Sequence, residues 1–261
     1  MGGVTRRQFF FPSRGNLLAA TLDEGALPTA LLIVTGGNEI RAGAFAGQAQ
    51  LAARIAQAGY PVLRYDRAGV GDSGGVNRGY RDGIEDIPAA VAALRQHIPQ
   101  VERIVGFGNC DAATALAFGP KDAFAALVLA NPWTFASETA PDHTPAAIRQ
   151  RYAARLRDPR QWQRLLSGGV DVGKLVSGLR RAASPGTPPL AEEMRHALAA
   201  YDRPVRFLLA GRDRTAAAFR EHWPAGDRRI EPCPGASHAF VEPAARDWLT
   251  ARLLDLLAAS G

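Results

Sequence analysis

The sequence predicts an α/β protein whose mostly parallel sheet is covered by helices on both faces. Two observations support this fold class. Short apolar segments alternate with amphipathic ones, and residues 134–203 interrupt that alternation with helical character and no strong strand. Strands that alternate with helices are typical of a parallel sheet covered on both sides. A chain of 261 residues is long enough for one such domain with an inserted segment.

The expected strands are short apolar runs bounded by turn residues. Segments 7–11 and 17–22 form an N-terminal hairpin, joined by a turn at Ser13-Arg14-Gly15-Asn16. The run 29–35 is nearly continuous in apolar residues, which predicts a strand buried on both faces of the sheet. Further strands are expected at 61–65, 102–107, 125–130, 205–210 and 229–232.

The expected helices lie between these strands. In the segment 83–97, apolar residues recur at helical spacing from Ile84 to Leu94, which predicts an amphipathic helix. A helix is also expected directly after the strand 102–107, over residues 111–118, where alanine is frequent. Other helices are expected at 45–58, 219–223 and 244–259.

Residues 1–133 and 204–261 therefore form the expected core, and residues 134–203 form an inserted helical cap with candidate helices at 148–156 and 162–166. Such a cap covers the carboxyl edge of the sheet, where open α/β folds bind ligands. It contains eleven Lys and Arg residues against seven Asp and Glu, and so holds most of the chain's net charge of +6. Two interpretations of this charge stay open: a phosphate-binding surface and a solvated helix face.

Composition excludes several classes of protein. No zinc-finger, RRM or helix-turn-helix pattern accompanies the basic cap, so nucleic acid is not an expected partner. The two cysteines, Cys110 and Cys233, are too few for a disulfide framework and too far apart in sequence for a metal-binding pair. The scarcity of cysteines indicates a reducing, cytoplasmic compartment. The histidines other than His238 form no ligand cluster and no transmembrane run is visible, so we expect no metal, no cofactor and no transmembrane segment.

Residues 106–112, Gly-Phe-Gly-Asn-Cys-Asp-Ala, place Cys110 between an expected strand and an expected helix. Gly108 and Ala112 flank it at minus two and plus two, where a nucleophile on a tight turn needs small neighbours. A helix N-terminus also stabilises a thiolate. The pattern resembles the nucleophile elbow of α/β-hydrolases with cysteine in place of serine. The alternative is a buried apolar cysteine in a glycine-containing turn.

In α/β-hydrolases the catalytic acid and then the histidine follow the nucleophile along the chain. Asp213 comes shortly after the expected strand 205–210, and His238 lies in the loop before the last helix. Taken singly, Asp213 is equally well explained as a helix N-cap, and His238 as a surface-loop residue. With Cys110 they match a triad in which His238 accepts the thiol proton, or holds a thiolate–imidazolium pair, and Asp213 orients the imidazole.

Two other candidate nucleophiles fail. Asp111 in that role would place Asn109 at minus two, where a small residue is needed. The sequence Gly71-Asp72-Ser73-Gly74-Gly75 copies the active-serine signature of chymotrypsin-like proteases. Those enzymes carry the catalytic histidine and aspartate before the serine, whereas the first histidine here is His97.

An oxyanion formed on the attacked carbonyl needs preorganised hydrogen-bond donors. The first expected donor is the backbone N–H of Asp111, directly after the nucleophile. The second is expected from the loop 36–40 after the third strand, and the backbone N–H of Asn38 is the candidate.

Further motifs are spread over nearly the whole chain: Gly36-Gly37, Arg41 with Gly43, Arg64-Tyr65-Asp66, Gly69-Val70-Gly71-Asp72-Ser73, Cys110-Asp111, Asn131-Pro132-Trp133, Tyr152 with Arg155-Leu156, Gly211-Arg212-Asp213, Thr215-Ala216 and Gly235-Ala236-Ser237-His238. With these motifs the chain resembles the α/β-hydrolases and, more narrowly, the first type of exosortase A system-associated hydrolase. The resemblance implies the α/β-hydrolase fold and a bacterial gene near exopolysaccharide synthesis loci. The chain departs from that family at residues 38–40 and at Ala44-Phe45, where the family is more polar.

The cysteine nucleophile also resembles that of dienelactone hydrolases, in which a glutamate on the corresponding loop contacts the resting thiol. Glu39 is the candidate for that contact here, and the alternative is a solvated loop carboxylate.

The triad and the resemblance together imply an acyl hydrolase, a thioesterase or carboxylesterase, that works through an acyl-cysteine intermediate. The expected partner is a small-molecule or carrier-bound acyl ester or thioester, since attack of sulfur on a thioester is nearly isoenergetic. Two alternatives stay open. One is an acyltransferase that moves the acyl group to a sugar or amine acceptor. The other is a non-catalytic binding protein, against which an intact triad counts.

Overall fold

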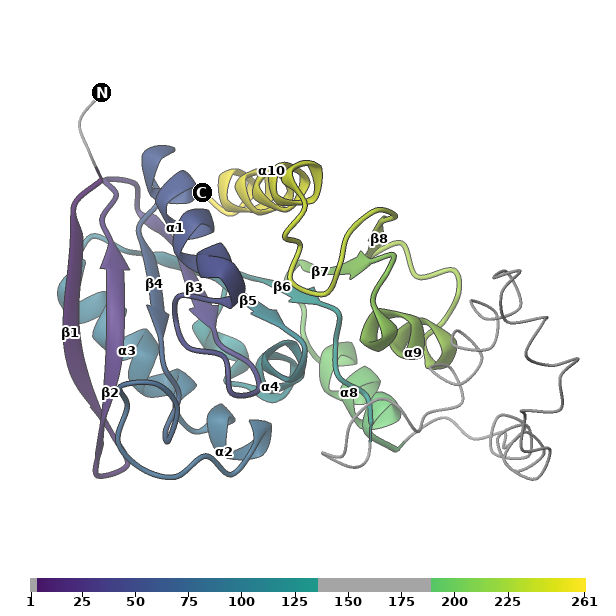
Figure 1. Ribbon diagram of the computed structural model, residues 1–261, viewed down its shortest axis with the longest axis horizontal. Helices are drawn as coiled ribbons and strands as arrows, with labels where there is room; N and C mark the ends of the chain where they lie inside the picture. Colours follow the sequence, from purple (N-terminus) through teal and green to yellow (C-terminus); the bar gives the residue numbers. More distant parts are fainter. Residues whose placement is uncertain (1–3, 136–188) are drawn as a thin grey trace, which may run out of the picture.

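The computed structural model describes residues 4–135 and 189–261. Their strands form one eight-stranded sheet in the order β1-β2-β4-β3-β5-β6-β7-β8, which confirms the predicted fold class (Figure 1). The strands are β1 (Arg6–Ser13), β2 (Asn16–Asp23), β3 (Thr29–Val34), β4 (Val62–Tyr65), β5 (Arg103–Asn109), β6 (Ala126–Ala130), β7 (Val205–Ala210) and β8 (Ile230–Cys233).

The sheet is antiparallel at one side and parallel over the rest. β1 and β2 form the predicted hairpin, and β2 also runs antiparallel to β4. From β4 through β3, β5, β6 and β7 to β8 every neighbouring pair is parallel. The carboxyl ends of these strands therefore lie at one edge of the sheet, and the loops that follow them meet there.

Helices cover both faces of the sheet. The described helical elements are η1 (Ala44–Ala46), α1 (Gly47–Gln57), α2 (Tyr80–Ile84), α3 (Ile87–His97), α4 (Asp111–Phe118), η2 (Lys121–Ala123), α8 (Pro189–Ala199), α9 (Arg214–His222) and α10 (Pro243–Ala259). Buried residues of α1 and α10 belong to one apolar cluster, and those of α3, α4, α8 and α9 belong to the other. Figure 1 shows α1 beside α10, apart from α3 and α4.

The strand β3 shows why a continuous apolar run forms the centre of this sheet. All of its residues are buried. Leu31 and Ile33 belong to the cluster with α1 and α10, whereas Leu32 and Val34 belong to the cluster on the opposite face. Successive side chains of a strand point to opposite faces, so a strand between two helical layers has to be apolar throughout.

The predicted helix 83–97 is divided in the structure into α2 and α3. The division falls at Asp86, whose buried carboxylate accepts hydrogen bonds from the Ser13 hydroxyl at 2.7 Å and from the backbone N–H of Ala68 at 3.0 Å. Pro88 lies in the first turn of α3 and supplies no N–H for a bond to the preceding turn. The helix therefore ends and restarts where tertiary contacts hold the Asp86 side chain.

Two other helix boundaries differ from the prediction. The helix expected at 45–58 begins with the short 3₁₀ turn η1, in which Phe45 and Ala46 have left-handed backbones at φ 53° and 56°. The regular helix α1 therefore starts only at Gly47. In contrast, α9 begins five residues before the expected start at 219, because Asp213 caps it.

The predicted cap, residues 134–203, lies mostly outside the described residues, as do its candidate helices 148–156 and 162–166. Its last part forms α8, whose Leu190, Met194 and Leu198 are buried in the same cluster as α4. The extent of the cap thus stays a prediction. Within the described segments, no helix combines the length and the apolar character that crossing a membrane requires.

Candidate active site

Cys110 occupies a strained turn between β5 and α4. Its backbone has φ 63° and ψ −127°, and few residues other than glycine adopt such a positive φ. A Cβ atom added to Gly108 would lie 2.7 Å from the carbonyl group of Ala112, so the position two residues before Cys110 accepts only glycine. The geometry matches the sharp strand-to-helix elbow expected from the sequence, and the half-buried thiol sits at the N-terminus of α4.

The structure brings His238 and Asp213 together with Cys110. The imidazole Nδ1 of His238 lies 3.0 Å from Asp213 Oδ1, and the ring also hydrogen-bonds the Cys110 side chain. The second carboxylate oxygen of Asp213 accepts the backbone N–H of Ala216 at 2.9 Å. Asp213 therefore has both geometries considered from the sequence: it caps α9 with one oxygen and binds His238 with the other.

The surroundings of His238 favour its charged form. Burial lowers the pKa of His238, but hydrogen bonds to Asp213 and Cys110, and the charges of these groups, raise it to about 10. A free histidine has a pKa of about 6.5. The ring lies between a carboxylate and a thiol, and both neighbours favour its charged form.

This shift predicts a pH-dependent contribution of His238 to stability. Because its pKa is higher in the folded than in the unfolded chain, the paired imidazolium stabilises the fold fully below about pH 6.5, and this stabilisation disappears as the pH rises towards 10. We expect the difference in unfolding free energy between the wild type and His238→Ala, measured by urea denaturation, to shrink steadily over this range. A difference that grows with pH would contradict the pairing.

The loop after β3 is fixed against the elbow by an ion pair. Asp111 accepts the backbone N–H of Gly37 at 2.6 Å through Oδ1, and the Arg67 guanidinium at 3.0 Å through Oδ2. Arg67, which is buried, also donates to the carbonyl oxygen of Gly37. Gly36 leaves no room for a side chain, since an added Cβ would collide with the Asp111 carboxylate and with the carbonyl oxygen of Asn109. Sequence reasoning did not single out Arg67.

A cavity of about 370 Å³ opens beside Cys110. Asn38 lines it, and its side-chain oxygen accepts the amide of Asn77 at 2.7 Å. Asp111 lines the same cavity. Among residues 4–135 and 189–261, no hydrogen-bond acceptor is found for the backbone N–H of Asn38 or Asp111. Both candidate oxyanion donors thus lie at the cavity lined by Cys110, and within the described residues their backbone N–H groups have no acceptor.

Glu39 lies at the same loop but turns towards α1. Its carboxylate accepts the backbone N–H of Ala44 and the side-chain amide of Gln48, each at 2.6 Å. Burial raises the pKa of Glu39, although these hydrogen bonds and the charge of His238 oppose the rise. In the part of the chain that the structure describes, no hydrogen bond joins Glu39 to Cys110. Glu39 instead lines a smaller cavity of about 140 Å³ between α1 and α10.

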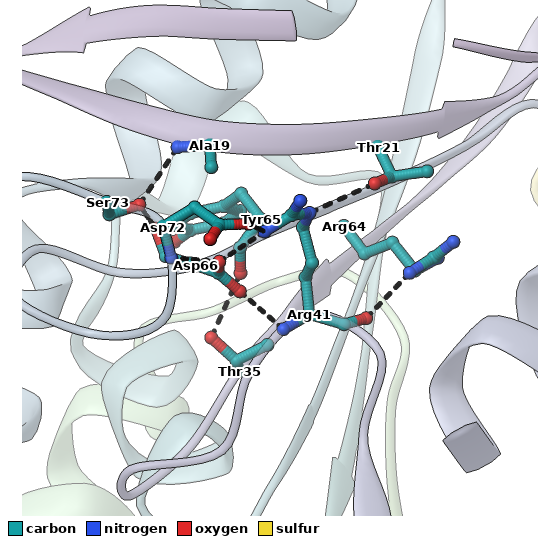
Figure 2. Close-up of polar contacts among 9 residues, drawn as sticks. All are labelled: Ala19, Thr21, Thr35, Arg41, Arg64, Tyr65, Asp66, Asp72 and Ser73. Atoms are coloured by element: carbon teal, nitrogen blue, oxygen red, sulfur yellow. Dashed lines mark hydrogen bonds and ion pairs between the residues drawn. The ribbon is translucent and has the colours of Figure 1, made fainter. Parts of the chain in front are cut away.

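A buried polar network also anchors the loop after β3 (Figure 2). Its centre is Asp66, which is fully buried, pairs with the guanidinium of Arg41 and accepts the backbone N–H of Asp72 at 3.0 Å. The backbone N–H of Arg41 donates to the other Asp66 oxygen, and the Arg41 carbonyl oxygen accepts Arg64 at 2.8 Å. These contacts give the Arg41 and Arg64-Tyr65-Asp66 motifs a structural role in holding the loop after β3.

The serine of the protease-like signature is part of this network. The Ser73 hydroxyl donates to the carbonyl oxygen of Asp66 at 2.6 Å and accepts the backbone N–H of Ala19 at 2.9 Å (Figure 2). Gly71 has φ 56°, and an added Cβ would collide with the Asp66 carboxylate. The glycine and serine residues of this signature therefore serve a tight turn, in agreement with the sequence argument against a catalytic Ser73.

Two asparagines that sequence reasoning gave no role also lie at the site. The side chains of Asn109, before Cys110, and of Asn131, after β6, both donate to the carbonyl oxygen of His238 at 3.0 Å. Asn131 belongs to the Asn131-Pro132-Trp133 motif, which contributed to the family resemblance but carried no predicted role for the asparagine. The one feature of the sequence that pointed to a role for Asn131 was its position directly after the expected strand 125–130.

Three features define an α/β-hydrolase fold: the strand order, the elbow after β5, and the loop between β8 and α10 that carries His238, here called the histidine loop. The family model described as the alpha/beta hydrolase family matches residues 31–252. The chain therefore belongs to the alpha/beta hydrolase family and is a hydrolase. No curated protein matches the sequence.

Solved structures with the same fold are numerous and distant in sequence. An esterase of Pyrococcus furiosus is 15% identical, with a TM-score of 0.67 over 98% of this chain and 91% of that one. The α/β hydrolase GrgF from a Penicillium species is 16% identical, with a TM-score of 0.66 over 98% and 99% of the two chains. Proline iminopeptidase of Mycobacterium smegmatis is 15% identical, with a TM-score of 0.61 over 97% and 98%. At these identities the likeness concerns the fold.

Proposed function

We propose that this hydrolase cleaves ester or thioester bonds with a Cys110–His238–Asp213 triad through an acyl-cysteine intermediate. The observation that carries the proposal is the position of His238, which hydrogen-bonds Asp213 on one side and the Cys110 side chain on the other. Nucleophilic catalysis needs a nucleophile, a base within hydrogen-bond reach of it and a third group that orients the base. The contacts of His238 with Asp213 and Cys110 support this assignment of roles.

In the first half-reaction, the Cys110 thiolate attacks the carbonyl carbon of the substrate. A C–S bond forms, and the π electrons of the carbonyl group move onto its oxygen. When the carbonyl group forms again, the bond to the leaving group breaks and the His238 imidazolium gives its proton to the departing alkoxide or thiolate. The products are acyl-Cys110, a neutral His238 and the free alcohol or thiol.

In the second half-reaction, water attacks the acyl carbon while His238 accepts one of its protons. The C–S bond breaks, the carboxylic acid leaves, and the thiolate–imidazolium pair is restored. The Asp213 carboxylate accepts a hydrogen bond from the Nδ1–H group of His238. Nε2 is therefore the ring nitrogen that gives and accepts protons in both half-reactions. Substrate and water balance the reaction, so it needs no cofactor.

The negative charge on the carbonyl oxygen is assigned to two backbone N–H groups, those of Asp111 and Asn38. Both residues line the cavity beside Cys110, and their N–H groups have no acceptor in the described parts of the chain. Preorganised donors of this kind stabilise a developing oxyanion because they need no rearrangement during the reaction. The ion pair between Asp111 and Arg67, and the contacts of both with Gly37, hold the two donors at the same site.

We favour a thioester or activated ester, on a small molecule or a carrier protein, as the substrate, because a thiolate exchanges one C–S bond for another without a large energy change. The motifs shared with exosortase A system-associated hydrolases support a role in exopolysaccharide-related metabolism. A catalytic thiol works only in its reduced form, so a reducing, cytoplasmic location is part of the proposal. Cys110 and Cys233 are both free thiols.

The proposed intermediate can be detected by intact-mass spectrometry. The protein is incubated with a panel of acyl-thioesters and esters and quenched with acid. We expect a mass increase equal to the acyl group, which peptide mapping assigns to Cys110. Addition of a sugar or amine acceptor shows whether the acyl group also leaves by transfer.

The matched control is Cys233→Ala, because Cys233 is buried at the end of β8 and burial raises the pKa of its thiol. This variant is expected to form the same adduct, whereas Cys110→Ala forms none. An adduct on Cys233 alone, or product formation by Cys110→Ala, would contradict the proposal.

A further inference from the structure

We infer that Asn109 and Asn131 are positioning residues, which keep the three loops of the triad in register through the carbonyl oxygen of His238. The inference rests on the proposed function, because it assigns these amides a role in the same reaction. Neither side chain touches the thiol or the imidazole in the hydrogen bonds described. Their effect is therefore exerted through the backbone of the catalytic residues.

The two amides form a closed set of hydrogen bonds. Asn131 donates to the Asn109 side-chain oxygen at 2.9 Å and to the His238 carbonyl oxygen at 3.0 Å. Asn109 donates to the same carbonyl oxygen at 3.0 Å. The carbonyl oxygen of His238, in the loop between β8 and α10, thus accepts two side-chain N–H groups. Together these two hydrogen bonds restrict the movement of this loop.

The same set reaches the other two triad residues through adjacent backbone. Asn109 directly precedes Cys110, whose own N–H donates to the carbonyl oxygen of Ala130 at 3.0 Å. The side-chain oxygen of Asn131 accepts the N–H of Ala210 at 2.8 Å, and the carbonyl oxygen of Ala210 accepts the N–H of Asp213 at 3.1 Å. The ends of β5, β6 and β7 and the histidine loop are therefore joined at one point.

The chemistry of Asn131 fits this role closely. It is fully buried and has φ 42°, a left-handed conformation in which asparagine is enriched among residues with a side chain. It has to donate twice and accept once, which a carboxylate or a hydroxyl group of similar size cannot do. A buried, fully satisfied polar group at this position specifies one arrangement of the loops around it.

Hydrogen bonds therefore fix both the side chain and the main chain of His238. Asp213 holds the imidazole through Nδ1, and the two amides hold the main-chain carbonyl. A shift of about 1 Å in a reacting group can lower the rate by about 10²-fold, so this restraint bears directly on the transfer of a proton between His238 and Cys110. Loss of the amides should affect the chemical step more than substrate binding.

The test is the variant Asn131→Gly, which keeps the left-handed backbone and removes the amide. We expect kcat for thioester hydrolysis to fall by about 10-fold to 10²-fold, with KM nearly unchanged. A second measurement needs no substrate: the rate constant for alkylation of Cys110 by iodoacetamide near neutral pH should fall towards that of His238→Ala. Asn109→Ala, which leaves the bond from Asn131 to His238 in place, should show a smaller loss of both rates.

The matched control is Tyr201→Phe. It removes one buried hydrogen bond, from the Tyr201 hydroxyl to the carbonyl oxygen of Phe124 at 3.0 Å, at the opposite end of β6 from Asn131. Its kcat and its alkylation rate are expected to match the wild type, even if urea denaturation shows a similar loss of stability. An equal loss of both rates in Tyr201→Phe would overturn the positioning role.

The alkylation rates also separate two ways in which the argument can fail. If the wild type reacts fast, His238→Ala slowly and Asn131→Gly as fast as the wild type, the positioning role is wrong and the triad stands. If the wild type reacts no faster than His238→Ala, the thiol–imidazole pair does not exist, and both the proposed function and the positioning role are wrong.

Discussion

Replacing Cys110 with alanine is expected to lower the rate of thioester hydrolysis by at least about 10³-fold, while the protein stays folded. The whole acyl-cysteine route depends on this sulfur, and no other side chain at the elbow can take its place, because Asp111 is bound to Arg67 and Gly37. The structural effect should be small. Cys110 is half-buried and alanine is smaller, so we expect a change of less than about 1 kcal/mol in unfolding free energy.

The measurement is kcat/KM for an acyl-thioester, combined with urea denaturation of each variant. Cys110→Ser keeps a small nucleophilic side chain at the elbow and should retain weak esterase activity, because a hydroxyl group ionises far less readily than a thiol. Cys233→Ala should keep full activity. Wild-type turnover in folded Cys110→Ala would end the case for a cysteine nucleophile.

Replacing Asp213 with asparagine is expected to reduce kcat by about 10³-fold to 10⁴-fold without loss of the fold. Asparagine can still accept the backbone N–H of Ala216 and so caps α9 as aspartate does. Towards His238 it offers an amide and no negative charge. The imidazole is then left in the wrong tautomer, and the imidazolium that forms during the reaction lacks its counter-charge.

Asp213→Ala provides the comparison, because it removes the cap as well. We expect it to lose activity as Asp213→Asn does, and to lose a further 0.5–2 kcal/mol or so of unfolding free energy through the missing N-cap. Kinetics and urea denaturation of the two variants separate the catalytic contribution of Asp213 from its structural one. If Asp213→Asn kept wild-type activity and only Asp213→Ala lost activity and stability, Asp213 would be a cap and nothing more.

The centre of the sheet could be predicted from local sequence because its strands are apolar on both faces. β3 and β6 are wholly buried, and a run of apolar residues of that length has few alternatives between two helical layers. The elbow could also be predicted from the sequence, because Gly108 lies two residues before Cys110. The structure shows why glycine is needed there, since position 108 has no space for a Cβ atom. In both cases the cause lies within a few neighbouring residues.

The errors in the helices have causes that lie far away in the sequence. Asp86 divides α2 from α3 because the Ser13 hydroxyl, more than seventy residues before it, binds its carboxylate. Phe45 and Ala46 adopt left-handed backbones without being glycine, which no local preference indicates. Periodicity describes an isolated helix well but carries no information on such tertiary contacts.

The candidate site shows the same division. Chain order was enough to select Cys110, Asp213 and His238, because each follows an expected strand or precedes the last helix. Asn109 and Asn131 were not assigned, since an asparagine in a loop is common and its partners become visible only when β5, β6 and the histidine loop are placed side by side.

For anyone who wishes to redesign the substrate range, the backbone around the thiol sets clear limits. Gly36, Gly71 and Gly108 are enclosed so tightly that any larger residue would collide with its neighbours. Asn38 and Asn77, in contrast, line the cavity beside Cys110 and are at least partly exposed. A mutational library that randomises these two positions and leaves the three glycines untouched should yield mostly folded proteins with altered acyl preference.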